Sequence, residues 1–307
     1  MKSKGKWYFL GAANRTTIAE KFITENNYLH LGIDFIAIEK LSSVAPPIAD
    51  FLSVENGPDF DSDGIFDFFK TKLESGLDIS FIPFMDSACR ALALHNFKNF
   101  SGYFGTPSSV QLSDKKWIME FSKRHGLPFT DFTGLSSEVI IKPRFGYGSR
   151  ELIKVGIHSE DIGRYIADDN FVVQDFLTGP EVSIDAYFFK DGNYSAIARE
   201  RLRIEAGEVV ETKTRDLKLI EHEFLNKLSK ESNIIGPINI QTIGVDSKIL
   251  EVNPRFSGGS TASIAAGWNA PRWLLLEYVK EQYPNNVVKY DHVHVVRSRR
   301  DHVRRLM

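Results

Sequence analysis

The sequence predicts an α/β domain built on a parallel sheet, followed by a strand-rich α+β region. Up to about residue 105, short apolar runs alternate with helical patterns, at 7–11, 18–28, 33–38, 65–73, 79–83 and 88–97. Strands that alternate with helices favour a parallel sheet covered on both faces. The last third of the chain is rich in strands instead, which indicates a second kind of architecture.

Length and composition are typical of a globular enzyme. At 307 residues the chain is long enough for two or three packed subdomains that enclose a cleft. Its net charge of -2 gives no general attraction to nucleic acid or anionic lipid, so we expect neither a nucleic-acid nor a membrane partner. Cys89 is the single cysteine, which excludes an intrachain disulfide and fits a cytoplasmic location.

The first predicted strand ends at Gly11, where nucleotide-binding α/β domains keep a glycine. We therefore expect a Rossmann-like N-terminal domain. The segment that follows reads Gly-Ala-Ala-Asn and lacks the G-x-G-x-x-G spacing, so dinucleotide binding is only weakly supported.

A second region begins at Ser113, which is a predicted N-cap for a helix that runs through Lys123. Strand patterns and helical patterns then share the rest of the chain. The predicted strands are 139–143, 151–155, 171–173, 182–188, 238–245, 248–252 and 287–297. The predicted helices are 159–168, 220–230, 262–266 and 273–280, and an exposed arginine-rich hairpin surrounds Gly207.

A glycine-containing loop follows the strand that ends near Lys142. Gly146 and Gly148 allow backbone N–H groups to approach an anion closely, and Lys142 supplies a positive charge beside them. Phosphate is the natural ligand of such a loop. A flexible hairpin with an incidental lysine explains this segment equally well when it is taken alone.

A possible nucleotide hinge lies at 176–181, which reads Phe-Leu-Thr-Gly-Pro-Glu. It follows a strand rich in β-branched residues, so its extended backbone can offer a carbonyl and an N–H to the edge of a purine. Glu181 can then accept hydrogen bonds from ribose hydroxyls. A plain Gly-Pro turn explains the backbone but gives Glu181 no role.

Oxygen-bearing side chains gather on the last strands. Period-2 alternation places Glu251 and Asn253 on one face, Arg255 lies just beyond them, and a neighbouring strand can bring Gln241 alongside. Mg²⁺ prefers a few protein oxygens of this kind, supplemented by water and phosphate. Exposed polar positions on a one-sided sheet are the alternative.

The order of these motifs resembles the ATP-grasp superfamily, and 82–86 and 253–259 are similar to the branch typified by the carbamoyl-phosphate synthase large subunit. The resemblance runs from about Trp7 to Arg297. It implies a Rossmann-like domain at 1–105 followed by a two-lobed ATP-grasp fold, with a small lobe at 106–177 and a C-terminal lobe at 178–307.

The resemblance also implies roles for residues that would hold ATP. Lys115 and Lys142 would contact its phosphates, and the loop from Gly146 through Gly148 to Ser149 would close over them. The backbone of Gln174 and Leu177 would hold adenine, and Glu181 would hold the ribose. Asp175 stands where many relatives have Glu or Lys, which leaves its contact open.

The implied metal and catalytic residues come from the last strands. Gln241, Glu251 and Asn253 would hold Mg²⁺ (or Mn²⁺), and Arg255, together with Lys142, would act on the transferred phosphoryl group. No role follows from the sequence for Arg199, Arg201 and Arg203, which match a basic hairpin in related ligases or pair across strands with nearby glutamates.

These implications favour a carboxylate–amine ligase that acts through an acyl phosphate. Its partners would be small carboxylate and amine substrates, and a homodimer is left open. Half of a divided carbamoyl-phosphate synthase, which would phosphorylate bicarbonate or carbamate, is the alternative enzyme. A non-catalytic ATP-binding sensor is the alternative from another class.

Overall fold

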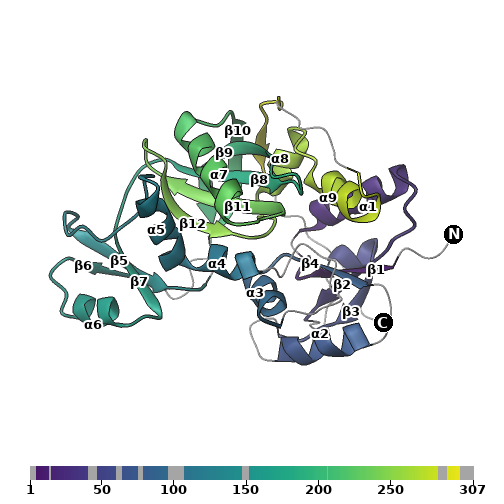
Figure 1. The fold of residues 1–307 in the computed structure, drawn as a ribbon, viewed down its shortest axis with the longest axis horizontal. Helices are drawn as coiled ribbons and strands as arrows, with labels where there is room; N and C mark the ends of the chain where they lie inside the picture. The colour runs from purple at the N-terminus through teal and green to yellow at the C-terminus, as the bar shows by residue number, and fades with distance from the viewer. Residues whose placement is uncertain are drawn as a thin grey trace.

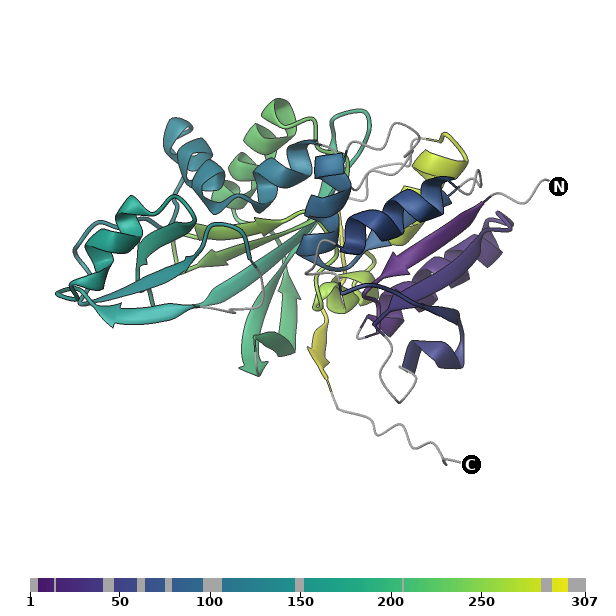
Figure 2. The ribbon, with the colours of Figure 1, turned by 90° about the horizontal axis from the view of Figure 1, so that it is seen from below.

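The computed structural model describes residues 5–13, 15–40, 47–59, 64–74, 79–95, 107–146, 152–205, 207–282 and 289–297. Within these ranges the chain forms sheets of four, six and three strands. The six-stranded sheet lies in the middle, the four-stranded sheet at one end and the three-stranded sheet at the other (Figure 1). Figure 2 shows the strands of the central sheet fanning out between the two smaller sheets.

The N-terminal sheet is parallel, as predicted, with strand order β3-β2-β1-β4. Stacked rings of Phe9 and Phe35, 5.0 Å apart, lie in its core. Strand β3 was not predicted, because it is a short polar edge strand without an apolar run. The elements are β1 (Lys6–Leu10), α1 (Thr16–Tyr28), β2 (Asp34–Glu39), a 3₁₀ helix (Pro47–Asp50), β3 (Ser53–Asn56), α2 (Gly64–Glu74), β4 (Ile79–Pro83) and α3 (Asp86–His95).

The small three-stranded sheet is antiparallel, with order β6-β5-β7, and has its own core of Val139, Ile141, Ile162 and Val173. Its elements are β5 (Glu138–Pro143), β6 (Ile153–Gly156), α6 (Asp161–Ala167) and β7 (Phe171–Asp175), preceded by α4 (Pro107–Ser113) and α5 (Lys115–Arg124).

The N-cap predicted for the helix before this sheet was wrong by one residue. Asp114, not Ser113, accepts hydrogen bonds from the backbone N–H groups of Lys116 and Trp117, at 3.0 and 3.4 Å. Ser113 instead ends α4, a helix that the sequence reasoning missed. A carboxylate is as good an N-cap as a hydroxyl and also favours the positive end of the helix.

The central sheet has the order β12-β11-β8-β9-β10-β13, and all its pairings are antiparallel. Its elements are β8 (Glu181–Phe188), β9 (Tyr194–Glu205), β10 (Glu208–Arg215), α7 (Leu219–Glu231), β11 (Gly236–Ile243), β12 (Lys248–Asn253), α8 (Ser260–Ala265), α9 (Ala270–Val279) and β13 (His294–Val296). The last strand is shorter than predicted, and residues 287 and 288 of that prediction lie outside the described residues.

The predicted fold class is therefore confirmed: a parallel N-terminal sheet followed by two antiparallel sheets. Contacts tie the N-terminal domain to the central lobe, for example Arg272 Nη1 to Glu25 Oε2 at 2.8 Å. None of the helices in the described ranges is long and apolar enough to cross a membrane.

Candidate functional site: two cavities that meet at Glu251

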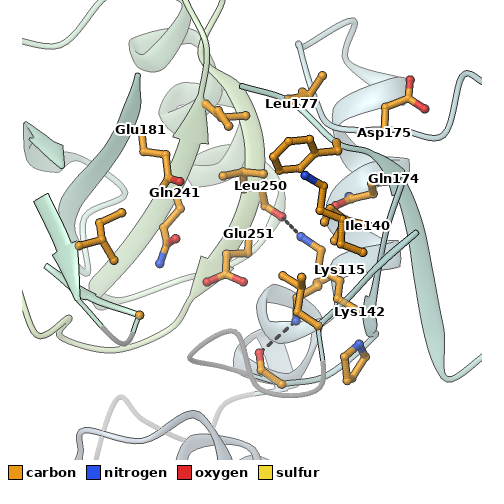
Figure 3. Close-up of a pocket in the computed structure, with 18 of the residues that line it drawn as sticks. Lys115, Ile140, Lys142, Gln174, Asp175, Leu177, Glu181, Gln241, Leu250 and Glu251 are labelled. Atoms are coloured by element: carbon orange, nitrogen blue, oxygen red, sulfur yellow. Dashed lines mark hydrogen bonds between the residues drawn. The ribbon is translucent and has the colours of Figure 1, made fainter. Parts of the chain in front are cut away.

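A cavity of about 420 Å³ lies between the small three-stranded sheet and the central sheet. One wall comes from β5, β6, β7 and the start of α5, and the other from β8, β9, β11 and β12. Lys115 and Lys142 face Glu181, Gln241 and Glu251 across this space (Figure 3). The fold thus brings together residues that are up to 136 positions apart, from Lys115 to Glu251.

Two ammonium groups are held on one side of the cavity. Lys115, at the start of α5, donates to the carbonyl oxygen of Gly146 at 3.0 Å, and Lys142 donates to that of Leu250 at 3.3 Å (Figure 3). The pKa of Lys142 is lowered to about 8, chiefly by burial and also by the charge of Lys115, while the charge of Glu251 opposes the shift. Two cations confined so closely repel each other, and a bound anion would relieve that repulsion.

Glu251 is the carboxylate opposite these lysines. Burial by itself would raise its pKa, but the charges of Lys115 and Lys142 and a hydrogen bond from Asn253 hold the pKa below its usual value. Gln241 is its partner across β11 and β12. An ionised carboxylate beside an amide oxygen fits Mg²⁺, which takes oxygen ligands and shares them with phosphate.

Asn253 lies beside this pair but contributes differently from Gln241. It is buried, and its Nδ2 donates to Glu251 Oε1 at 3.2 Å. It lines neither of the two cavities of this site, whereas Gln241 and Glu251 line both. The structure therefore places two of the three predicted metal ligands at the cavity walls and the third behind Glu251.

A second cavity, of about 270 Å³, adjoins the first. The residues that line both cavities are Arg201, Gly207, Gln241 and Glu251. Four arginines line the second cavity: Arg15, Arg199, Arg201 and Arg255. The N-terminal domain adds Gly11, Phe84 and Met85 to its walls. A group bound there would meet a group bound in the first cavity beside Glu251.

Comparisons with known proteins agree with this architecture. Residues 167–301 match a family described as ATP-grasp in the biosynthetic pathway with Ter operon. The structure is similar to the biotin carboxylase domain of 2-oxoglutarate carboxylase from Hydrogenobacter thermophilus, with 14% identity and a TM-score of 0.70, over 94% of this chain and 73% of that one. That domain was crystallised as a dimer with MgADP and bicarbonate.

Two further solved structures are similar. One is N5-carboxyaminoimidazole synthetase from Staphylococcus aureus in complex with ADP, with 15% identity and a TM-score of 0.69, over 95% of this chain and 82% of that one. The other is L-amino acid ligase from Bacillus licheniformis, with 17% identity and a TM-score of 0.62, over 91% and 75%. The chain has the ATP-grasp fold.

In this ATP-grasp fold the predicted hinge lies along one edge of the first cavity. Gln174 and Leu177 both line the cavity, and the buried side chain of Gln174 donates to the carbonyl oxygen of Thr130 at 3.0 Å. The contact of its backbone with adenine stays a prediction. Asp175 also lines the cavity, and its carboxylate accepts from the backbone N–H of Thr133 at 3.3 Å, so its side chain holds a turn.

Arg255 lies where the central lobe meets the N-terminal domain. Its guanidinium is paired with Asp86 of the N-terminal domain and donates from Nη1 to the carbonyl oxygen of Phe256 at 3.1 Å. It lines the second cavity and not the first. Asp86 thus fixes the orientation of Arg255 at the wall of the second cavity.

The arginine-rich hairpin is not uniformly exposed, which corrects the sequence-based expectation. Arg199 is buried, donates from Nε to Asp185 Oδ2 at 2.8 Å and also contacts Ser257. The side chain of Arg201 is 9% exposed, and that of Arg203 is 51% exposed. Alternation along β9 places the three on one face, but only the covering loop at Ser257 decides how deeply each is buried.

Two glycines make that covering loop possible. A Cβ atom added to Gly259 would lie 2.1 Å from Arg199 Nη1, and one added to Gly258 would lie 2.5 Å from Glu208 Oε2. Side chains at these positions would push the loop off the arginines. Of the predicted phosphate loop, Gly146 lines the first cavity, while Gly148 and Ser149 lie outside the described residues.

Proposed function

We propose that this chain is an ATP-dependent ligase that phosphorylates a carboxylate and then transfers the acyl group of the resulting acyl phosphate to an amine. The observation that carries the proposal is the meeting of two cavities beside Glu251. The first is lined by three lysines, Lys115, Lys142 and Lys154, and by apolar side chains suited to a nucleotide, and the second has several arginines suited to a carboxylate.

In the first step, an oxygen of the substrate carboxylate attacks the γ-phosphorus of ATP, and the bond from that phosphorus to the β,γ-bridging oxygen breaks. ADP leaves, and the substrate becomes an acyl phosphate. Lys115 and Lys142 would neutralise the negative charge that grows on the phosphoryl oxygens. They lie on the nucleotide side, and their role is positioning and charge neutralisation.

In the second step, an amine attacks the acyl carbon and inorganic phosphate leaves, while the amine nitrogen loses a proton. Arg255, held by Asp86, would orient the carboxylate oxygens in the second cavity. Glu251 and Gln241, with Asn253 behind them, would hold Mg²⁺ (or Mn²⁺). The metal would neutralise phosphate charge when bound.

A second candidate is a reaction like that of carbamoyl-phosphate synthase, with bicarbonate or carbamate in place of a larger carboxylate. The crystallisation of the similar biotin carboxylase domain with bicarbonate favours testing it. Both candidates place the acceptor in the second cavity. We also propose the division of the chain into 1–105, 106–177 and 178–307.

The test combines two measurements on the purified chain with Mg²⁺. ADP release is recorded for a panel of carboxylates, including bicarbonate, with and without amines. Hydroxylamine then traps an acyl phosphate as a hydroxamate. We expect ADP and hydroxamate to appear together for at least one organic carboxylate. Tight ATP binding without ADP release across the panel would favour a sensor, and release with bicarbonate alone would favour the second candidate.

A further inference from the structure

Arg201 has the one positively charged side chain among the described residues that line both cavities. Lys115 and Lys142 line only the first cavity, and Arg255 lines only the second. Arg201 therefore stands where the terminal phosphoryl group of a nucleotide and a bound carboxylate would come together. This position gives a role to a residue that the sequence motifs left without one.

The contacts of Arg201 fix its guanidinium in place but do not use all its hydrogens. Nη1 donates to Glu181 Oε2 at 2.8 Å and to Gln241 Oε1 at 2.9 Å, and Nη2 lies 3.5 Å from the carbonyl oxygen of Gly207. Nε is buried and has no acceptor in the described part of the chain. The guanidinium of arginine has five N–H groups, so these three contacts leave the Nε hydrogen and one Nη2 hydrogen without an acceptor in the described part of the chain.

The electrostatic surroundings also favour an incoming anion. Burial lowers the pKa of Arg201, and the nearby charge of Arg199 lowers it further, while Glu181 raises it. An arginine keeps its proton regardless, so it stays a cation that is only partly neutralised by Glu181. Phosphoryl oxygens that gain charge at this point would find a planar donor already oriented.

We propose that Arg201 is a catalytic residue that binds the phosphoryl group as it passes from the nucleotide to the carboxylate. The part of this inference that concerns transfer to the carboxylate rests on the proposed function. The part that concerns contact between Arg201 and the terminal phosphoryl group of the nucleotide can be tested without any carboxylate. The alternative is that Arg201 only positions Glu181 and Gln241.

The test compares two ligands that differ in the γ-phosphoryl group. Dissociation constants for ADP and for β,γ-methylene-ATP are measured by calorimetry with Mg²⁺, for the wild type and for Arg201→Met. We expect the affinity for the ATP analogue to fall at least about tenfold and that for ADP to change less than about threefold. A role limited to positioning Glu181 would weaken both ligands equally, because both carry the ribose.

The matched control is Arg203→Met, two residues further along β9. Arg203 lies 3.3 Å from Glu205 Oε1, is 51% exposed and lines neither cavity, so both affinities should stay at wild-type values. Arg201→Lys keeps the charge but cannot bridge two acceptors in a plane, so it should recover part of the analogue affinity. It also serves as the test variant if Arg201→Met does not fold.

Equal losses for the two ligands in the Arg201 variants, or no loss for either, would overturn the proposal. If Arg201→Met shows the selective loss but the wild type turns over no carboxylate, the ligase function is refuted and the contact of Arg201 with the phosphoryl group stands. Once a substrate is known, kcat should fall about tenfold to a thousandfold in Arg201→Met, with the KM for the carboxylate changing less.

Discussion

Replacing Lys142 by methionine should raise the stability of the fold while it weakens nucleotide binding. Lys142 is partly buried, and its pKa is lowered from 10.5 to about 8, chiefly by burial. That difference corresponds to at most about 3 kcal/mol of destabilisation of the charged form. A lysine that destabilises the fold in this way is typical of a site whose ligand needs the positive charge, and a phosphate is such a ligand.

The sign of the pH dependence follows from the two pKa values of Lys142. Below pH 8 the lysine is protonated in both the folded and the unfolded state, so its full cost is present. Between about pH 8 and pH 10.5 the unfolded state holds more protons, so the stability of the wild type rises with pH relative to that of Lys142→Met. Loss of the hydrogen bond to Leu250, at 3.3 Å, costs the variant about 1 kcal/mol at every pH.

Urea denaturation at several pH values measures this difference. We expect the variant to be more stable than the wild type by about 1 to 2 kcal/mol at pH 7, with the gap closing or reversing above pH 10. Calorimetry should show ATP affinity at least about tenfold weaker in the variant, and wild-type affinity falling above pH 8 as Lys142 loses its proton.

The control is Lys116→Met, because Lys116 pairs with Asp169 at 2.7 Å and does not line the nucleotide cavity. Its ATP affinity should match the wild type. The reasoning is refuted if the stability gap between the wild type and Lys142→Met is independent of pH. Unchanged ATP affinity in that variant would separately remove Lys142 from the phosphate site.

Three further outcomes are expected. Glu251→Ala should lose Mg²⁺-dependent nucleotide binding when metal is limiting, and full binding in calorimetry would contradict the metal assignment. Arg255→Lys should keep ADP affinity within about threefold while the rate of ADP production falls about tenfold to a thousandfold, on the order of 1.4 to 4 kcal/mol of transition-state stabilisation. An equal loss of affinity and rate would show that Arg255 does not contact the reacting groups. Gly259→Ala should destabilise the fold by about 1 to 3 kcal/mol, because its Cβ would lie 2.1 Å from Arg199 Nη1. The control is Gly163→Ala, which has open space around the added Cβ and should not destabilise the fold. Equal unfolding midpoints for the two variants would disprove the packing of Gly259 on Arg199.

Local patterns in the sequence determined much of the fold and part of the site. Alternating strands and helices predicted the parallel N-terminal sheet, and period-2 alternation predicted that Glu251 and Asn253 lie on one face, where Asn253 donates to Glu251. Both are short-range properties, set by which face of an element each side chain occupies. Strand β3 and the N-cap at Asp114 were missed because polar edge strands and neighbouring cap residues give weak local signals.

Only the tertiary structure decided which residues surround each cavity. Alternation places Arg199, Arg201 and Arg203 on one face of β9, and no local rule separates them. The chain that covers this face does so: Gly259 packs on Arg199, the paired cavities meet at Arg201, and Arg203 is left 51% exposed. The pairing of Arg255 with Asp86 likewise spans 169 positions in sequence. Such contacts depend on how whole domains pack, because burial and partner choice are properties of the assembled surfaces and not of any one segment.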